Sequence, residues 1–280
     1  MKYAINVPNF GAFGDPQVLV GLAREAEAAG WDGFFVWDHM LGFEIPQGVP
    51  ITDPWIALAG AAATTSRIRL GTMVTPLARR RPWKVARETV ALDHLSGGRL
   101  VLGVGLGVPP EEFSSFGENP DPVVRGDKLD EGLAVLTGLW RGELFNFAGT
   151  HYTISNVQFR PRPVQEPRIP IWAAATWPNK RPLRRAAKLD GVFPFIAPDF
   201  ALPTPAQLRE ITAFVQKERA VDAPFDVVLA GESPDDSAEA AAFMAAYAEA
   251  GLTWWQEGLS ERRGSFEAMR PRSRQGPPRD

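Results

Sequence analysis

The sequence contains no cysteine and only three histidines among its 280 residues. The lack of cysteine excludes disulfide scaffolds, thiolate metal sites and cysteine nucleophiles. A formal charge of −3 lacks the basic excess that is typical of nucleic-acid-binding proteins. No apolar run reaches the roughly 18 residues of a membrane helix, and the start, MKYAINVPNFGAFGDP, lacks the unbroken apolar stretch of a signal peptide. We therefore expect a cytoplasmic protein without a nucleic-acid or membrane partner.

Short β-rich segments alternate with alanine-rich helical segments along most of the chain. The pairs Asp15-Pro16 and Asp53-Pro54 are typical of a helix N-cap followed by the first helical residue. The expected strands cover residues 3–7, 33–37, 68–74, 99–105, 169–175, 191–196, 225–230 and 252–256. The expected helices cover residues 16–30, 53–65, 82–95, 125–140, 178–188, 205–219 and 237–250, with a short helix after the last strand.

Eight strand–helix units predict a parallel sheet with right-handed crossovers, closed into an α/β fold of the (β/α)8 TIM-barrel class. An open doubly wound sheet is the alternative. Residues 1–270 then form one domain. The period breaks over about 141–168, which predicts a small inserted β-hairpin between the fourth and fifth units. We expect the tail, residues 271–280, to be mobile.

His39 is the most informative single residue, because barrel active sites lie at the C-terminal ends of the strands. It is the one histidine expected there, and a titrating imidazole at that place can exchange a proton. A structural histidine bonded to backbone is the alternative. Aromatic residues near the strand ends suggest contacts to an apolar substrate; they are Phe10, Phe13, Trp37, Phe43 and Trp255.

Two further segments favour a phosphorylated planar ligand. Gly103-Val-Gly105-Leu-Gly107 fails the G-x-G-x-x-G dinucleotide pattern, and predicts either tight packing or a flat ligand against bare backbone. The helix start at Trp177-Pro178-Asn179 carries Lys180 and Arg181, which suits an anion. A solvated basic face is the alternative there.

Other chemistries find little support in the sequence. HxH and HExxH patterns for a metal are absent, as is the GxSxG of a serine hydrolase. A glycosidase needs two facing carboxylates, and Glu111, Glu112 and Glu257 are the candidates, the first two in a segment that reads as a helix start. We expect no metal. The remaining combination suits a large planar cofactor that does the chemistry with little acid–base help.

Several segments in order resemble the bacterial luciferase-like superfamily of flavin- and deazaflavin-dependent oxidoreductases, the luciferase-like monooxygenase family. They are AREAEAAGWDGFFVWDHM, DPWIALAGAAATTSRIRLGTMVTP, SGGRLVLGVGLG with PPEEFSSFG, RGDKLDEGLAVLTGLWRG and IPIWAAATWPNKRPLRRAAKLDGVFP, with AGLTWW near the end. The resemblance covers about residues 1–258. It implies a (β/α)8 barrel that holds FMN or the deazaflavin coenzyme F-420, with the ring at the C-terminal end of the barrel.

The resemblance also implies roles for individual residues. His39 matches the histidine that lies close to the reactive ring and is the catalytic candidate. Met73-Val74 matches a non-proline cis peptide that forms a bulge behind the ring. The implied cofactor-binding residues are Met73, Val74, Thr75, Gly105, Gly107, Ala175, Thr176 and Trp177, with Lys180 and Arg181 near the phosphate.

The sequence departs from the family pattern in two places. Val108 stands where sugar-phosphate dehydrogenases of the family carry an acid, and Thr176-Trp177 replaces a frequent Gly-Gly. The first argues against sugar-phosphate oxidation, and the second changes how the phosphate is bound. The sequence Trp-Asp-His-Met after the second strand leans toward the deazaflavin rather than FMN.

The resemblance thus implies an oxidoreductase or monooxygenase acting on a small apolar organic substrate. It also implies a homodimer and, with FMN, a flavin reductase as partner. A non-catalytic flavin-binding relative and a cofactor-free barrel lyase or hydrolase are the alternatives.

Overall fold

A closed parallel barrel forms the centre of the molecule, as the computed structural model shows for residues 1–42, 48–220, 222–260 and 263–278. Its strands follow the order β1-β10-β9-β8-β7-β4-β3-β2. They are β1 (Lys2–Val7), β2 (Gly33–Val36), β3 (Arg69–Pro76), β4 (Leu100–Gly105), β7 (Ile171–Trp177), β8 (Gly191–Ile196), β9 (Asp226–Gly231) and β10 (Trp254–Gly258). The barrel prediction is confirmed over the open sheet, because β1 pairs with both β2 and β10.

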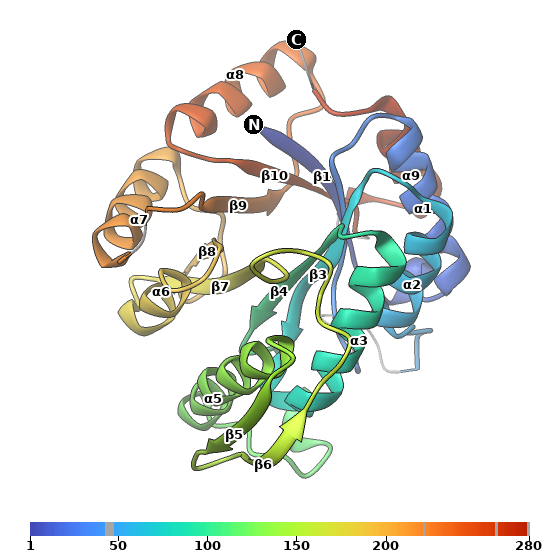
Figure 1. Ribbon diagram of the computed structural model, residues 1–280. Coiled ribbons are helices and arrows are strands. Elements are labelled where there is room, and N and C mark those ends of the chain that lie inside the picture. Colours follow the sequence, from blue (N-terminus) through green and yellow to red (C-terminus); the bar gives the residue numbers. More distant parts are fainter. Residues whose placement is uncertain (43–47, 221, 261–262, 279–280) are drawn as a thin grey trace.

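Helices surround the barrel on the outside (Figure 1). They are α1 (Pro16–Ala28), α2 (Pro54–Thr64), α3 (Pro82–Ser96), α5 (Pro122–Trp140), α6 (Lys180–Ala186), α7 (Pro205–Glu218), α8 (Ser237–Glu249) and α9 (Phe266–Gln275). Short helical turns η1 (Gly11–Phe13), η2 (Leu77–Arg79) and α4 (Glu111–Ser114) follow β1, β3 and β4. As predicted, Asp15 and Asp53 are N-caps whose side chains accept backbone N–H bonds. None of the helices in the described part of the chain has the length and apolar character that crossing a bilayer requires.

The predicted inserted hairpin is present as β5 (Leu144–Ala148) and β6 (Thr153–Gln158), which pair antiparallel. It lies beside α5 in Figure 1. Phe145 and Phe147 pack against the main core, while Leu144 on the other face is exposed. The hairpin therefore covers a helix and does not form a domain of its own.

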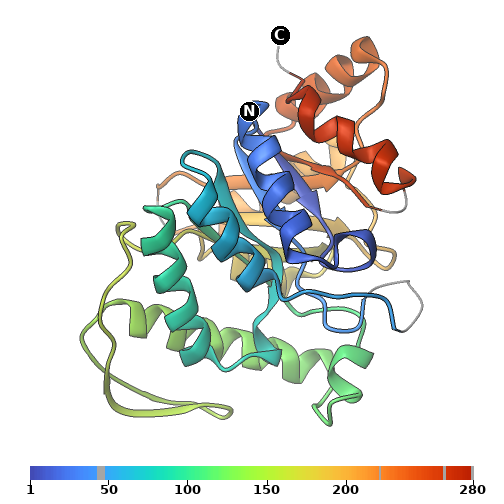
Figure 2. The ribbon, with the colours of Figure 1, turned by 90° about the vertical axis from the view of Figure 1, so that its right-hand side faces the viewer.

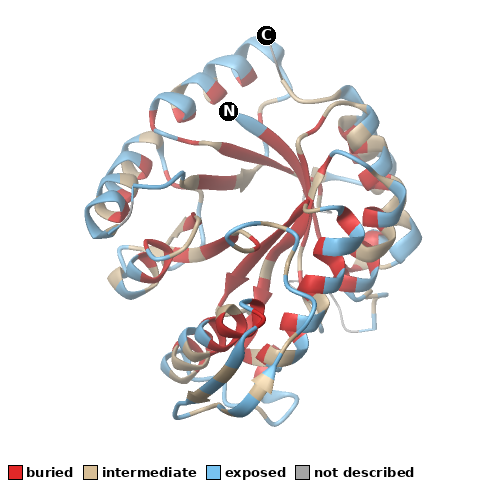
Figure 3. Ribbon diagram, in the orientation of Figure 1, coloured by how far each residue is buried: buried red, intermediate tan, exposed pale blue. Residues whose placement is uncertain are grey.

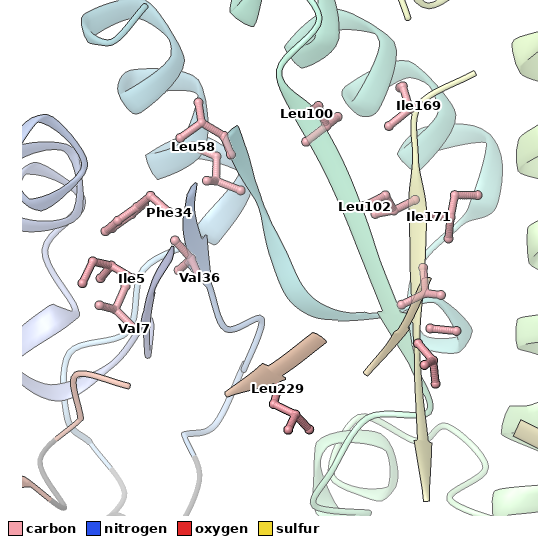
Figure 4. Packing of buried hydrophobic residues seen from close by; sticks show 14 of the residues in the cluster. Ile5, Val7, Phe34, Val36, Leu58, Leu100, Leu102, Ile169, Ile171 and Leu229 are labelled. Atoms are coloured by element: carbon pink, nitrogen blue, oxygen red, sulfur yellow. The ribbon is translucent and has the colours of Figure 1, made fainter. Parts of the chain in front are cut away.

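Alternate strand residues build two separate layers of apolar side chains, as the two-residue period of a strand requires. Outward-facing residues pack against the helices, and Figure 4 shows Phe34 and Val36 of β2 on the side of Leu58 from α2. Inward-facing residues fill the barrel; they are Ala4, Phe35, Met73, Val101, Trp172, Phe193, Val228 and Trp254. Figure 3 shows the resulting continuous burial along the strands. Because these side chains close the barrel interior, functional groups are left to its C-terminal end.

The C-terminal tail differs from expectation, because residues 271–275 belong to helix α9. Figures 1 and 2 both place α9 beside α1. Ser273 is fully buried and its carbonyl accepts a hydrogen bond of 2.9 Å from Nε1 of Trp31, while Arg270 and Arg274 pair with Glu25 of α1. Residues 271–275 of the tail that the sequence predicts to be mobile thus form part of a helix with partners on α1. The sequence of an arginine-rich segment with an internal proline is typical of disorder, and the partners that order it lie on α1, far away in the sequence.

Candidate active site

His39 lies directly after β2 and is held by the loop that follows β1. Nδ2 of Asn9 donates to the carbonyl of His39 at 2.8 Å, and the N–H of His39 donates to Oδ1 of Asn9 at 3.1 Å. Nδ2 of Asn9 also donates to the carbonyl of Thr52. Asn9 is fully buried, whereas the side chain of His39 is 13% exposed. The backbone around His39 is therefore fixed, and the ring of His39 reaches the surface at the C-terminal end of the barrel.

Glu112, in α4 after β4, contacts His39 through its side chain. Oε1 lies 3.1 Å from Nδ1 of His39 and accepts the backbone N–H groups of Met40 at 2.7 Å and Leu41 at 3.0 Å. Oε2 accepts a hydrogen bond from Nη1 of Arg79. Burial acts to raise the pKa of Glu112, but hydrogen bonds from His39 and Leu41 and the charge of Arg79 outweigh it and lower that pKa. Glu112 is thus a buried, ionised and fully paired carboxylate.

Arg79 extends the same network to Asp38. Nη2 of Arg79 donates to the carbonyl and to Oδ1 of Asp38, at 2.7 and 3.1 Å. Arg80 pairs with Asp38 as well, at 2.7 Å. The loops after β2, β3 and β4 are therefore joined by buried charges. Removing one partner of such a network leaves another charge unpaired and typically costs about 3–5 kcal/mol.

Three aromatic rings meet beside this network. The ring of Phe10 lies 5.8 Å from that of Trp37 and 5.7 Å from that of His39, and Trp37 lies 5.8 Å from His39, all edge to face. Nε1 of Trp37 donates to Oδ1 of Asn6, and Nδ2 of Asn6 donates to Oε1 of Gln256 at 2.6 Å. The structure thus brings together His39 and two of the expected substrate residues, Phe10 and Trp37.

Small inward-facing residues occupy other strands at the same end of the barrel. The register of β3 shifts between Thr72 and Thr75, where Met73-Val74 has the predicted cis peptide, and both Met73 and Val74 face the interior. A Cβ on Gly105 would lie 2.6 Å from Cγ2 of Val74, so the close approach of β3 and β4 requires glycine. Val74 and the inward-facing Ala174 and Ala230 are partly exposed, unlike the layer beneath them.

These residues fit a flavin-type ring. Small side chains on β3, β7 and β9, with the bare backbone of Gly105 on β4, leave apolar space above the inner layer of the barrel. Nε2 of Gln256 is buried and has no hydrogen-bond partner among the described residues, and such a donor suits a ring carbonyl oxygen. Gly107, with a φ of +83°, has its carbonyl held by Arg125 at 2.7 Å. The described residues contain no group of three or more His, Cys, Asp or Glu side chains placed to hold a metal ion.

Several expected site residues lie elsewhere. Trp255 packs in the helical layer against Phe243, and Phe13 packs in the same layer against Phe266 of α9, so neither faces the C-terminal end. The structure therefore does not bring Trp255 and Phe13 together with His39, and a substrate contact of either residue stays a prediction. Ala175 also faces the helices. Phe43 lies outside the described residues.

The expected phosphate-binding residues are also differently arranged. Nζ of Lys180 lies 3.6 Å from the ring centre of Trp177 and 4.3 Å from that of Phe214 in α7. Trp177 itself packs on the helical layer. Arg181 pairs with Asp127 and Asp130 of α5. Both cations are held by the helical layer, and α6 spans only seven residues, so the geometry does not support a phosphate site at these two side chains.

Thr75 and Thr176 take different positions. The hydroxyl of Thr75 donates to Oγ1 of Thr72 at 2.8 Å, and Thr75 is fully buried. Thr176 continues the inward alternation of β7, is partly exposed, and accepts a hydrogen bond at Oγ1 from Asn179. Thr176 is therefore the residue of this pair that faces the C-terminal end of the barrel.

The sequence assigned no role to three polar residues that support the site, namely Asn6, Arg79 and Gln256, and it offered Glu112 only as a glycosidase carboxylate. One signal was available, because Asn6 and Gln256 are polar residues inside otherwise apolar strands. Such residues are buried by the strand and need partners. Arg79 and Glu112 carried no such signal, since charged residues in loops are common.

A family model described as luciferase-like monooxygenase matches residues 4–277. The chain belongs to this family. An F420-dependent glucose-6-phosphate dehydrogenase from Beutenbergia cavernae is 36% identical over 166 residues, which cover 59% of this chain and 48% of that protein. The chain thus spans about half the length of the curated relatives it matches.

Solved structures share the fold of this chain at low sequence identity. An F420-dependent secondary alcohol dehydrogenase, in complex with an F420–acetone adduct, covers 100% of this chain and 99% of its own, with a TM-score of 0.81 and 16% identity. The oxygenating constituent of 3,6-diketocamphane monooxygenase from Pseudomonas putida, in complex with FMN, covers 85% and 69%, with a TM-score of 0.67 and 17% identity. These two structures therefore share the barrel fold with this chain.

Proposed function

We propose that this protein is an oxidoreductase that uses a flavin-type cofactor, the deazaflavin or FMN, on a small apolar organic substrate. The observation that carries the proposal is the position of His39. It lies at the C-terminal end of the barrel between the Phe10–Trp37 aromatic pair and a buried carboxylate. A histidine with only a structural role would not need a ring that reaches this end while its backbone is fixed separately by Asn9.

The chain's own residues divide into three groups in this proposal. Val74, Gly105 and Thr176, with Gly107 beyond the end of β4, border the space for the ring, and Met73 supports it from below. Phe10 and Trp37 contact the apolar part of the substrate, and His39 exchanges a proton with its reacting atom. A bound deazaflavin supplies or accepts a hydride, whereas reduced FMN activates oxygen for insertion.

The choice between the two cofactors is part of the proposal, and the deazaflavin is favoured. The Trp-Asp-His-Met sequence at 37–40 supports it, as does the similarity to F420-dependent relatives. Val108 supplies no acid beside Gly107, which disfavours a sugar phosphate as substrate. If FMN is the cofactor instead, a flavin reductase is the expected partner.

The test is titration of the purified protein with the deazaflavin and with FMN, followed by fluorescence and by turnover of hydrophobic alcohols and ketones. Saturable binding of one cofactor with turnover supports the proposal. Binding without oxidation or reduction of any substrate indicates a non-catalytic flavin-binding protein. Turnover of a substrate in the absence of both cofactors indicates a lyase or hydrolase, and either result overturns the proposal.

We also propose that the protein forms a homodimer. The resemblance to the luciferase-like family supports this proposal, and the exposed apolar side chains of Ile56 on α2 (68%) and Val123 on α5 (60%) are candidates for the contact. Light scattering of the purified protein distinguishes a dimer from a monomer of about half the mass.

A further inference from the structure

We propose that Glu112 is a positioning residue, which holds the imidazole of His39 so that the proton this ring exchanges is the one on Nε2. This inference rests on the proposed function of His39. It assigns a role to a residue that does not contact substrate or cofactor and acts through its neighbour.

The direction of one hydrogen bond determines which ring nitrogen of His39 carries a proton. An ionised carboxylate can only accept hydrogen bonds. Oε1 of Glu112 lies 3.1 Å from Nδ1 of His39, so Nδ1 must carry the hydrogen in this contact. The tautomer of a histidine is set by the hydrogen bond that one of its nitrogens makes. Nδ1 therefore keeps its proton in both the neutral and the charged ring, and Nε2 is the nitrogen that gains or loses one.

The carboxylate of Glu112 cannot turn away from His39. Its side chain is 0% exposed, and its two oxygens accept from Met40, Leu41 and Arg79 in addition to His39. The charged groups around it are Arg79 of η2 and, through Arg79, Asp38 and Arg80. The carboxylate is thus fixed by donors from two loops besides the ring. The ring is oriented before any ligand arrives, as an efficient site requires.

A positioning role of Glu112 differs from a merely structural one. Because Glu112 also binds the N–H groups of Met40 and Leu41, it joins the loops after β2, β3 and β4. If Glu112 only linked the loops, its effect would be the same whatever residue stood at position 39. Positioning predicts that Glu112 sets the tautomer of His39, and that its effect on turnover depends on the presence of that imidazole.

The tautomer is tested by nitrogen-15 NMR of histidine-labelled protein without cofactor, at alkaline pH where imidazole rings are neutral. The sequence has only His39, His94 and His151, so the spectrum is simple. Nε2 of His94 lies 2.7 Å from the carbonyl of Arg162, and since a carbonyl only accepts, His94 has its proton on Nε2 and serves as an internal reference. We expect the opposite pattern, with the proton on Nδ1, for His39. A proton on Nε2 of His39 in the wild-type protein overturns the inference, and this test needs no variant.

Glu112→Gln replaces the charged acceptor by a neutral one and weakens the bond to Nδ1–H. We expect the Nδ1–H resonance of His39 to move upfield, while the resonances of His94 stay in place. Glu111→Gln is the matched control, because Glu111 is the exposed neighbour of Glu112 and makes no side-chain contact that the described residues show. An unchanged His39 resonance in folded Glu112→Gln, whose folding is checked by circular dichroism, overturns the inference.

Turnover gives the second readout. We expect Glu112→Gln to lower kcat by about 10- to 100-fold, as the loss of an orienting partner commonly does. In a His39→Ala background the same change should lower kcat by less than about 2-fold, because coupled residues are not additive. Equal losses of kcat in the wild-type and His39→Ala backgrounds show that Glu112 only links the loops, and they overturn the inference. If His39→Ala does not change turnover, the proposed role of His39 is wrong. The NMR experiment still tests the tautomer, because it does not depend on turnover.

Discussion

The indole N–H of Trp37 donates to Oδ1 of Asn6, and this single contact orients a chain of buried amides. An indole nitrogen can only donate, so Oδ1 of Asn6 must face Trp37 and Nδ2 must face Gln256. Gln256 then presents Oε1 to Asn6 at 2.6 Å, which leaves its own Nε2 as the remaining donor. The hydrogen-bonding direction at this end of the barrel is therefore set by Trp37.

Trp37→Phe and Trp255→Phe form a matched pair, because each removes one indole hydrogen bond, to Asn6 or to Glu257. An acceptor left without its donor costs about 1–3 kcal/mol, so urea unfolding should show a similar loss for both. Trp37→Phe should also raise KM for the substrate, whereas Trp255→Phe should leave KM within about 2-fold, since Trp255 faces the helical layer. A larger KM change in Trp255→Phe would show that Trp255 acts on the substrate site from the helical layer.

His39→Ala should lower turnover by about 100-fold or more, the usual size of a lost acid–base contribution. Cofactor affinity and melting temperature should change little, because Asn9 binds the backbone of His39 rather than its ring. The control is His94→Ala, whose ring lies on the surface against the carbonyl of Arg162. Steady-state kinetics and thermal melting check both variants, and turnover of His39→Ala within 2-fold of wild type would refute the catalytic role.

Gly105→Ala should destabilise the protein by about 1–3 kcal/mol, the common cost of overpacking. The new Cβ would lie 2.6 Å from Cγ2 of Val74 and 3.3 Å from Cβ of Ala174, so β3 and β4 must separate or Val74 must move into the barrel end. Val74→Ala removes the colliding methyl groups, and the double variant should recover most of the loss. Denaturant unfolding of the two single variants and the double variant measures the coupling, and simple additivity would mean that the two side chains do not collide.

Arg181→Ala and Arg185→Ala test what the cations of α6 do, because both pair with Asp130. The side chain of Arg181 is 51% exposed, and such surface pairs contribute at most about 1 kcal/mol. The side chain of Arg185 is 7% exposed and bonds Asp130 and the carbonyl of Gly126, so its loss should cost more, about 1.5–3 kcal/mol.

The cofactor affinity of Lys180→Ala/Arg181→Ala is the companion measurement. We expect it to remain within about 2-fold of wild type, since both side chains are held by α5, Trp177 and Phe214. A marked loss of affinity together with a weaker salt dependence would restore these residues as the phosphate site.

Glu25→Gln should loosen α9 and do so in a pH-dependent way. The hydrogen bond from Arg270, helped by Arg274 against the opposing effect of burial, lowers the pKa of Glu25 from 4.5 to about 2. A carboxylate with a depressed pKa stabilises the fold above its unfolded value, and this stabilisation is lost as the pH falls from 4.5 through about 2. Glu25→Gln should therefore melt below wild type at pH 7 and match it near pH 2.

The control for the pH experiment is Glu210→Gln, at an exposed position of α7 whose side chain makes no hydrogen bond or ion pair with the described residues. Its melting temperature should follow that of the wild type at every pH. Limited proteolysis at pH 7 gives an independent check, because a loosened α9 becomes accessible to cleavage. If α9 were equally protected from cleavage in Glu25→Gln and in wild type, the hydrogen bond of Trp31 and the apolar contacts would be sufficient to hold α9 in place.

Most of the fold could be predicted from the sequence, because its signals are local. Strand period, Asp-Pro caps and the break at the hairpin depend on residues within one turn or one strand of each other, and the structure reproduces all of them. The position of His39 follows as well, because a barrel brings every strand end to one face. The resemblance to the family supplied the cis peptide at Met73-Val74, which composition alone could not indicate.

The partners of charged and aromatic residues were decided by the closed barrel. Trp254 and Trp255 are neighbours in one strand, so their order in the sequence does not tell which of them faces inward. The sequence left Arg181 available to bind a phosphate, but in the structure α5 places Asp127 and Asp130 beside it. His39 and Glu112 are 73 positions apart, and only the parallel arrangement of β2, β3 and β4 places them 3.1 Å from each other. Local pattern determines which elements form, whereas a buried charge can take a partner from any distance in the chain, and that choice belongs to the tertiary structure.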